Sequence, residues 1–425
     1  MQTKNYVTGK PPFKFLVLYA LAFFGAWCAL LAPTTISLAY KVGDLFGDDK
    51  KTTYLSIILA VGAVCALISN PIFGKLSDGC YSKMGRRKPF LISGLVGGTI
   101  FLCTLTFCNQ LWSLILVWCL TQIAFNLAIA ALNAIMVDKS SPKYRGTISA
   151  ASGLGGTVGM LSGAGIATLF TTMVDYQTIG QYLLFIAPGI FGAILIAIFI
   201  IFLKDTPIQK PQGKMRFWKN LITSFTFNPI KNSDFTKILI CRFLLFMGIS
   251  CVTAYLLFYL QDKIYPNPPD HDTKPQEVLL IVNIIAAACA VVGSVVSGKL
   301  TDMFGGRKLF IIISAAFFIG ALLLIAFVTQ QWVMYVVAVV LGFVNGIVNT
   351  VSQVVVTLVM PNQQEAGKWM GISNISSTLP QSIGPAIAPL FLMIGGPNNY
   401  TALFIAVIVI LIGGGGLTFF IKKVK

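Results

Sequence analysis

The sequence predicts an all-α membrane protein whose chain crosses the bilayer twelve times. Only 11% of its 425 residues are charged, 56% are hydrophobic, and the mean hydropathy is +0.82. Soluble globular chains carry about 25% charged residues, so a soluble fold is excluded. The apolar residues also fall in blocks of about 20, the length that a helix needs to cross the hydrocarbon core of a bilayer.

Twelve such blocks follow one another along the chain. They cover residues 15–39, 54–75, 89–108, 112–136, 146–170, 180–203, 237–260, 277–298, 308–328, 332–359, 369–393 and 400–420. Helices are predicted because the blocks lack the alternation of a barrel strand, and lipid cannot satisfy an open strand edge. The first block is too long and too polar at its centre for a cleaved signal peptide, so we expect it to stay in the protein.

The basic residues predict the orientation. If both termini are cytoplasmic, 26 of the 31 Lys and Arg residues lie on the inner side, and 5 lie outside. This is the positive-inside pattern. Topology thus accounts for the net charge of +17, and no nucleic-acid partner is expected. We expect a monomer in the cell membrane, a bacterial plasma membrane, with lipids as its surroundings.

Cysteine and histidine give no sign of a metal or cofactor site. The nine cysteines lie almost entirely within predicted spans, without a CxxC pair or ligand-like spacing, and are interpreted as small hydrophobic residues. The single histidine, His271, is interpreted as a solvated residue of an outer loop. No cofactor and no metal are expected.

An internal duplication divides the chain into two halves. The run Gly74-Lys75-Leu76-Ser77-Asp78 recurs 224 residues later as Gly298-Lys299-Leu300-Thr301-Asp302, and each copy is followed by a basic turn. Two pseudo-symmetric six-helix bundles are therefore predicted, residues 1–203 and 237–425, joined by a cytoplasmic linker, residues 204–236. Residues 215–227 of the linker mix aromatic and basic residues, which predicts an amphipathic helix on the inner membrane surface.

The repeated loop resembles the signature cytoplasmic loop of the major facilitator superfamily. The first copy in full, NPIFGKLSD followed by GRRKPF, and the later run DKSSPKYRG are similar to loops of the glycoside–pentoside–hexuronide:cation symporters and the related sucrose-type carriers. The resemblance implies the major facilitator fold and transport by alternating access. It also implies that a network at the helix ends holds the two halves in one state, with the gating residues Asp78, Arg86, Arg87, Asp302 and Arg307.

The carboxylates of Asp78 and Asp302 give this network a physical basis. Placed at a helix end, a carboxylate can pair with arginines and with the N-terminus of a neighbouring helix. The alternative interpretation is a surface charge cluster that only fixes the topology. Duplication of the aspartate in the same register favours the gating role.

Neutral amide side chains follow one face of the fourth and of the tenth predicted span, which the duplication makes equivalent. Polar residues within spans tend to face the bundle interior or a watery cavity. The resemblance implies that the first, fourth, seventh and tenth helices line the central cavity, and the eleventh span adds a further polar face. The alternative is that the amides join helices to one another. The predicted substrate-binding residues are Trp27, Gln122, Asn126, Asn133, Asn345, Asn349, Gln353, Asn374 and Gln381.

Acidic residues are absent from the middle of the spans, since all 14 fall in loops or at helix ends. The positions of the aspartates that the resembling symporters place in their second helix hold Asn70 and Ala66 here. Transport is therefore expected to be facilitated, or coupled to protons through a helix-end carboxylate. Asp138 is the leading candidate and Glu277 the second, although Asp138 also has a structural interpretation as a partner of Arg145.

The sequence thus favours a carrier for a small neutral solute such as a sugar, glycoside or polyol. Amides donate and accept hydrogen bonds as sugar hydroxyls do, and Trp27 offers an aromatic surface. An exporter of amphipathic drugs or lipids is the alternative. A receptor or an enzyme is less favoured, and the chain contains no HExxH or GxSxG motif. Arg242, the one charge within a span, is either a residue that reaches the membrane interface or a substrate anchor.

Overall fold

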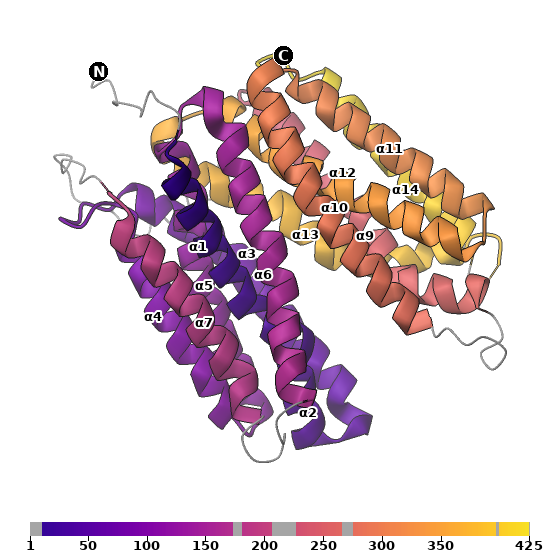
Figure 1. Ribbon diagram of the computed structural model, residues 1–425, viewed down its shortest axis with the longest axis horizontal. Helices are drawn as coiled ribbons and strands as arrows, with labels where there is room; N and C mark the ends of the chain where they lie inside the picture. The colour runs from indigo at the N-terminus through magenta and orange to yellow at the C-terminus, as the bar shows by residue number, and fades with distance from the viewer. Residues whose placement is uncertain (1–10, 173–180, 206–226, 266–274, 397–398, 425) are drawn as a thin grey trace. The chain divides into compact units, whose positions relative to one another are not determined.

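The computed structural model describes residues 11–172, 181–205, 227–265, 275–396 and 399–424, and these residues form helices without any strand (Figure 1). Each predicted span holds a helix, so the predicted all-α fold is confirmed. The helices of the first half are α1 (Phe13–Ala32), α2 (Leu38–Phe46), α3 (Asp48–Asp78), α4 (Lys88–Thr104), α5 (Leu111–Asp138), α6 (Arg145–Thr172) and α7 (Gln181–Phe202). Those of the second half are α9 (Ser233–Tyr259), α10 (Pro275–Phe304), α11 (Arg307–Phe327), α12 (Gln331–Val359), α13 (Ala366–Leu392) and α14 (Tyr400–Phe419).

Length and composition make ten helices of the described residues candidate membrane spans. The helices at the other two predicted spans, α6 and α13, have 28 and 27 residues, which is long enough to cross the hydrocarbon core. The first span is interrupted by a π-helical turn, Pro33–Ser37, between α1 and α2. Proline lacks the backbone N–H that a regular helix needs, which explains why the turn begins at Pro33.

Two compact units divide the chain. The first comprises Met1–Ser141, Ala151–Phe227 and Asn362–Asn374, and the second comprises Pro142–Ala150, Asn228–Pro361 and Ile375–Lys425. The first residues of α6 and of α13 thus group with the other half of the sequence. The predicted bundle boundaries at residues 203 and 237 stay a prediction. The predicted amphipathic helix, residues 215–227, lies outside the described residues except for Phe227.

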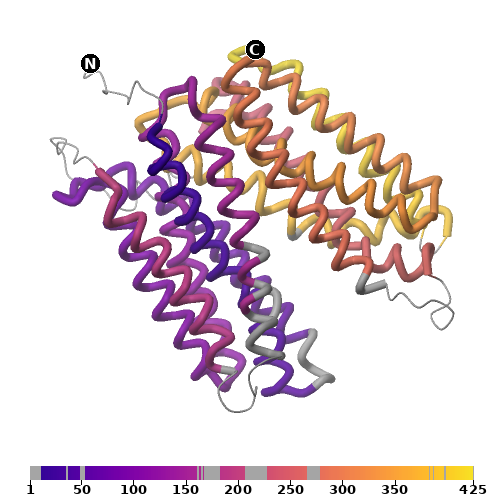
Figure 2. Tube along the Cα trace, in the orientation of Figure 1, coloured from indigo at the N-terminus to yellow at the C-terminus, as the bar shows by residue number. Residues whose placement is uncertain are grey.

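Small residues bring helices of the first unit into backbone contact. Gly155, Gly159 and Gly163 of α6 face the carbonyl oxygens of Ala20, Phe24 and Cys28 on α1, and a Cβ atom at any of these glycines would collide there. Elsewhere in this unit α1 packs along α7, and α5 packs against both α3 and α4 (Figure 2). These three glycines therefore form a helix-packing surface, as small residues do in membranes.

The second unit repeats this arrangement. There α10 packs along α12, α9 packs along α14, and α11 contacts both α12 and α14. Gly342 and Gly346 of α12 lie against the carbonyl oxygens of Ala286 and Ala290 on α10. Close packing of α12 in this unit fixes the direction in which its polar residues point.

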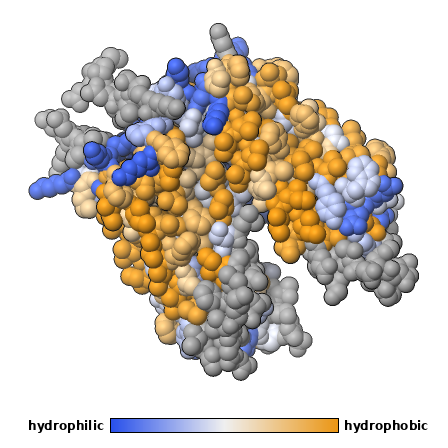
Figure 3. Space-filling model, viewed as in Figure 1, coloured by the Kyte–Doolittle hydropathy of each residue, from blue (hydrophilic) through white to orange (hydrophobic). Residues whose placement is uncertain are grey.

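Apolar side chains cover the outer faces of the helices. Ile190, Ile194 and Ile201 of α7 are exposed, as are Leu280 and Ile284 of α10. Figure 3 shows hydrophobic residues over the visible faces of both helices. Such faces suit lipid, which leaves polar side chains on other faces to contact protein, water or a solute.

Candidate functional site

Amide side chains join α3 and α5 in the first unit. Asn126 is 6% exposed, and its Nδ2 donates to the carbonyl oxygen of Gln122 at 2.9 Å and to the Gln122 Oε1 at 3.3 Å. Its Oδ1 accepts from Nδ2 of Asn70, which is 1% exposed, at 2.9 Å. The Oδ1 of Asn70 has no hydrogen-bond partner in the part of the chain that the structure describes. The group therefore retains one buried acceptor.

The other predicted residues of this unit lie in different surroundings. Trp27 is half-buried and packs beside Gly156 of α6, and Asn133 is also half-buried. Tyr19 is buried, and its hydroxyl donates to the carbonyl oxygen of Leu132 at 2.9 Å. Tyr19 therefore belongs to the core, whereas Trp27, the aromatic residue of the predicted group, is partly exposed.

The polar face of α12 is more open. Asn349 is exposed, and its Nδ2 donates to the Asn345 carbonyl oxygen at 3.0 Å and to the Asn345 Oδ1 at 2.7 Å. Asn345 and Gln353 are half-buried. An exposed amide in the middle of a 29-residue apolar helix is costly in lipid and is tolerated where water or a solute reaches it. This face is the clearest candidate for solute contact.

The polar residues of α13 fall in both units. Asn374 is half-buried, whereas Gln381 is exposed and donates from Nε2 to the carbonyl oxygen of Ser377 at 3.1 Å. Three prolines, Pro380, Pro385 and Pro389, interrupt the hydrogen bonding of this helix. Each proline removes an N–H donor and leaves a carbonyl oxygen without its helical partner.

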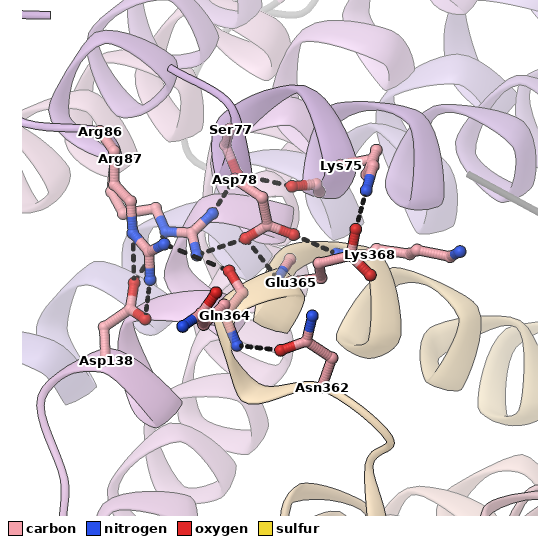
Figure 4. Close-up of polar contacts among 12 residues, drawn as sticks. Lys75, Ser77, Asp78, Arg86, Arg87, Asp138, Asn362, Gln364, Glu365 and Lys368 are labelled. Carbon is pink, nitrogen blue, oxygen red and sulfur yellow. Dashed lines mark hydrogen bonds and ion pairs between the residues drawn. The ribbon is translucent and has the colours of Figure 1, made fainter. Parts of the chain in front are cut away.

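The first copy of the duplicated run ends in Asp78, which lies against the first residues of α13. The carboxylate of Asp78 accepts from the backbone N–H groups of Gly367 and Lys368, each at 2.9 Å (Figure 4). Gly74, four residues earlier, touches the backbone of Gly367, and a Cβ on either glycine would collide with the other residue. A carboxylate at this position meets the unpaired N–H groups and the positive end of the helix.

Two arginines surround Asp78 and Asp138 in the same unit. Nη2 of Arg87 donates to Asp78 at 2.7 Å and its Nε donates to Asp138 at 2.9 Å, while Arg86 also pairs with Asp138. Burial opposes the charge on Arg87, but the carboxylates of Asp138 and Asp78 outweigh it and raise the pKa of the guanidinium above its usual value. Lys75 pairs with Glu365, just before α13. The carboxylates therefore favour the charged form of the buried Arg87.

The second copy of the loop repeats the contact at the beginning of α6. Asp302 accepts from the backbone N–H of Gly146 at 2.9 Å, and from the N–H and the hydroxyl of Thr147 at 2.7 and 2.5 Å. Gly298 touches the backbone of Gly146, as Gly74 touches Gly367. In both copies the carboxylate binds the second and third residues of a helix.

The second copy differs from the first in its arginine. Arg307 and Asp302 form no ion pair within the described ranges, and the Nε atom of Arg307 has no hydrogen-bond partner there. In the second copy the Thr147 hydroxyl donates to Asp302, whereas in the first copy Arg87 donates to Asp78. Arg307 therefore contributes charge near Asp302 without a direct bond.

The coupling candidates are placed unequally. Asp138 is held by Arg86 and Arg87 as described, whereas the side chain of Glu277 lies outside the described part of the chain. Arg145 is fully buried and donates to the carbonyl oxygen of Thr357 at 2.7 Å. The predicted pairing of Asp138 with Arg145 stays a prediction.

In the described residues no group of three or more His, Cys, Asp or Glu side chains could hold a metal ion.

Sequence reasoning expected a helix N-terminus near the duplicated aspartates but did not identify α6 and α13 as the helices that receive them. Gly146 and Gly367 are the second residues of α6 and α13, and each is matched by the glycine of its loop copy. A signal was available, because the two pairs of glycines lie at corresponding places of the two halves. Arg242 donates to the hydroxyls of Ser352 on α12 and Ser376 on α13, and no such signal in the sequence pointed to these partners.

Comparison with known proteins identifies one family model that matches most of the chain. The model of the Major Facilitator Superfamily matches residues 15–286 and 238–425. The multidrug resistance protein MdtG of Proteus mirabilis is 24% identical over 343 residues, covering 78% of this chain and 77% of that protein. The class H tetracycline resistance protein of Pasteurella multocida is 22% identical over 296 residues, 69% of this chain and 68% of the relative. A general alpha-glucoside permease of Schizosaccharomyces pombe is 27% identical over 133 residues, 29% of this chain and 24% of the permease.

Solved structures share the fold at low identity. The human organic anion transporter MFSD10 (TETRAN) superposes with a TM-score of 0.72 at 16% identity, over 96% of this chain and 100% of that chain. The proton:xylose symporter XylE, bound to 6-bromo-6-deoxy-D-glucose, gives a TM-score of 0.71 at 13% identity, over 97% of this chain and 96% of that chain. At these identities the likeness shows the fold alone.

Proposed function

The chain belongs to the Major Facilitator Superfamily and is a secondary transporter of the membrane, and we propose that its solute is a small hydroxyl-rich molecule such as a sugar, glycoside or polyol. The observation that carries this proposal is the exposed amide of Asn349 at the middle of α12, hydrogen-bonded to Asn345. Amides offer both donors and acceptors, which match the hydroxyl groups of such a solute. The buried amides Asn126 and Asn70 support it from the first unit.

The charge of the solute is constrained by the same residues. No acidic side chain lies at the middle of a span, so a cationic solute would find no counter-charge there. Neutral and anionic solutes remain compatible with the amide faces. The predicted similarity to the glycoside–pentoside–hexuronide:cation symporters, which depends on two loops, stays a prediction.

Gating is proposed to depend on the two carboxylate contacts at helix starts. Asp78 and Asp302 each hold the N-terminus of a helix whose remaining length belongs to the other unit. Arg87 strengthens the first contact by donating to Asp78 directly, and Asp138 joins Arg87 to Arg86. Such charge-assisted bonds break as a set, which suits a transition between two discrete states.

Export of amphipathic drugs is the second candidate, because two of the relatives described above are named for resistance to tetracycline and to multiple drugs. Uptake into proteoliposomes of labelled hexoses, glucosides and polyols, with tetracycline and ethidium as the drug panel, separates the two. Saturable transport of a hydroxylated solute is expected, and Asn126→Ala should weaken it more than Thr121→Val does. Thr121 is a fair control because its hydroxyl only bonds to Val117 within α5. Transport of drugs alone would refute the proposal.

A further inference from the structure

A buried arginine of the second unit has no acidic partner among the described residues. Arg242 is 3% exposed and occupies α9 nine residues after its start at Ser233. At about 1.5 Å per residue this places its backbone about 13 Å into the helix. Its Nη1 donates to the Ser352 hydroxyl at 2.7 Å and its Nε donates to the Ser376 hydroxyl at 3.3 Å. The guanidinium also lies 5.5 Å from the centre of the Phe246 ring.

Two of the other buried arginines of the described residues face carboxylates, and the third meets the C-terminal end of a helix. Arg86 and Arg87 face carboxylates. Arg145 donates to the carbonyl oxygen of Thr357, in the last turn of α12, where the helix dipole is negative. Arg242 has two neutral hydroxyls, and no carboxylate of the described ranges pairs with it. Removing an unpaired charge from water is costly, so its retention within a span requires a reason.

A purely structural role does not supply that reason. The two hydroxyls would accept from a neutral amide equally well, and without the cost of burying a charge. A guanidinium presents five N–H donors in a plane, matched to the two oxygens of a carboxylate. Two of these donors reach the serines. The remaining donors of the group are suited to an anion.

Arg242 is also adjacent to the face that we assign to solute contact. Ser352 follows Asn349 by three residues on α12, so the two side chains are neighbours on one helix face. Asn349 is exposed, whereas Ser352 is fully buried against the guanidinium. A solute whose hydroxyl groups meet Asn349 would therefore have its other end near Arg242.

We propose that Arg242, positioned by Ser352 and Ser376, binds a carboxylate of the solute, so that the carrier takes a hydroxy acid such as a sugar acid. This inference rests on the proposed transport of a hydroxyl-rich molecule and adds a single negative charge to it. The sequence predicted a neutral solute, and Arg242 is the observation against that part of the prediction. One guanidinium between two hydroxyls matches a singly charged carboxylate better than a phosphate ester, which carries nearly two charges.

The test compares acids with neutral molecules of the same skeleton. Binding to the purified full-length carrier is measured by thermal shift and by titration with gluconate and sorbitol, glucuronate and glucose, and glycerate and glycerol, with glucose 6-phosphate as the phosphate arm. The wild-type protein is expected to bind at least one acid tenfold or more tightly than its neutral partner. If every neutral molecule binds as well as its acid, or only the phosphate ester binds, the proposal is wrong.

Two variants locate the charge preference. Arg242→Gln should weaken binding of the acid by roughly 10- to 100-fold, the effect of losing a charge-assisted hydrogen-bond pair, and should leave a neutral partner nearly unchanged. Arg242→Lys, which keeps the charge but loses the planar fork, should show an intermediate loss. Acid binding that is equal in wild type and in Arg242→Gln would overturn the assignment. If Arg242→Gln does not fold, the Lys variant and the wild-type comparison decide.

Lys41→Gln is the matched control for loss of a buried positive charge. Lys41 is 5% exposed, and it donates to the carbonyl oxygen of Thr106 and to Asn109 in the first unit. This variant should change thermal stability without altering the preference for the acid. Neutral polyols that bind equally to all variants would refute the anion site but retain the proposed function. Failure of both acids and polyols, with binding of drugs, would refute both.

Discussion

Replacing Asp302 by asparagine should alter the balance between the two access states of the carrier. The carboxylate of Asp302 accepts three hydrogen bonds from the first residues of α6, two from backbone N–H groups and one from the Thr147 hydroxyl. Asparagine keeps the size of the side chain but has one neutral acceptor oxygen and directs an NH₂ group toward donors. The substitution therefore removes the charge and at least one bond without creating a cavity.

The magnitude follows from the contacts that are lost. Hydrogen bonds to charged groups contribute about 1.5–3 kcal/mol each, so Asp302→Asn should cost about 2–3 kcal/mol in the state that contains the contact. This corresponds to a roughly 30- to 150-fold change in the equilibrium between states. Asp78→Asn should cost more, about 3–5 kcal/mol, because it also breaks a buried ion pair with Arg87.

The assay reads the two states through a single engineered cysteine. In a background without the nine native cysteines, Asn349→Cys places a thiol at the exposed middle of α12. Its labelling by a membrane-impermeant maleimide is measured in right-side-out and inside-out vesicles. Both aspartate variants should increase labelling from the cytoplasmic side, because the broken contacts lie at the cytoplasmic ends of α3 and α10.

Asp234→Asn is the control for the chemistry of the substitution. Asp234 also accepts from two backbone N–H groups, those of Lys422 and Lys423, but these follow α14 and involve neither α6 nor α13. It should lower thermal stability without changing the sidedness of labelling. Equal labelling ratios in wild type, Asp78→Asn and Asp302→Asn would refute the gating role and leave the topology interpretation of the cluster.

Three further predictions use other residues. Asn349→Ala and Asn126→Ala should each weaken solute binding about tenfold or more, since an unpaired buried polar partner costs about 1–3 kcal/mol; unchanged affinity in both would remove them from the site. Gly146→Ala should reduce expression and stability because its Cβ would collide with Asp302 and with the Gly298 backbone, whereas Gly320→Ala, which meets nothing within 4 Å, should be tolerated; thermal melting of the two compares them. Transport into proteoliposomes should not respond to a sodium gradient, since Asn70 offers an amide where a carboxylate would be needed to offset the lost hydration of the ion; accumulation driven by sodium alone would contradict this.

The fold could be predicted from the sequence because hydropathy in a membrane chain is a strong constraint. Every predicted span contains a helix of the structure, with differences of a few residues at the ends. The π-helical turn at Pro33 is a local deviation from the first predicted block, and its proline was visible in advance. What the pattern could not show is that the first residues of α6 and α13 group with the opposite half, since hydropathy carries no information about partners.

The candidate site was predictable only in part. The amides of α5 and α12 stood out because polar residues are rare within spans, but sequence spacing could not tell exposed Asn349 from Asn126, which α3 covers through Asn70. Arg242 was visible as a charge. Its meaning depends on Ser352 and Ser376, which are 110 and 134 residues away in sequence. Partners at such separations follow from helix packing and not from any local pattern.

Asp138 is the leading sequence candidate for proton coupling and also has a structural interpretation. It illustrates the conflict between a helix-end carboxylate that titrates and one that holds the fold. A carrier must become neutral in each cycle, yet both Arg86 and Arg87 donate to this carboxylate. Protonation would remove the anion that Arg86 and Arg87 share, so proton uptake at Asp138 requires the cluster to open in the same step. If Asp138 couples transport, Asp138→Asn should abolish accumulation driven by a proton gradient and preserve solute exchange without a gradient. If it only holds the cluster, the variant should reduce exchange and thermal stability together, and the ion pairs favour this second outcome.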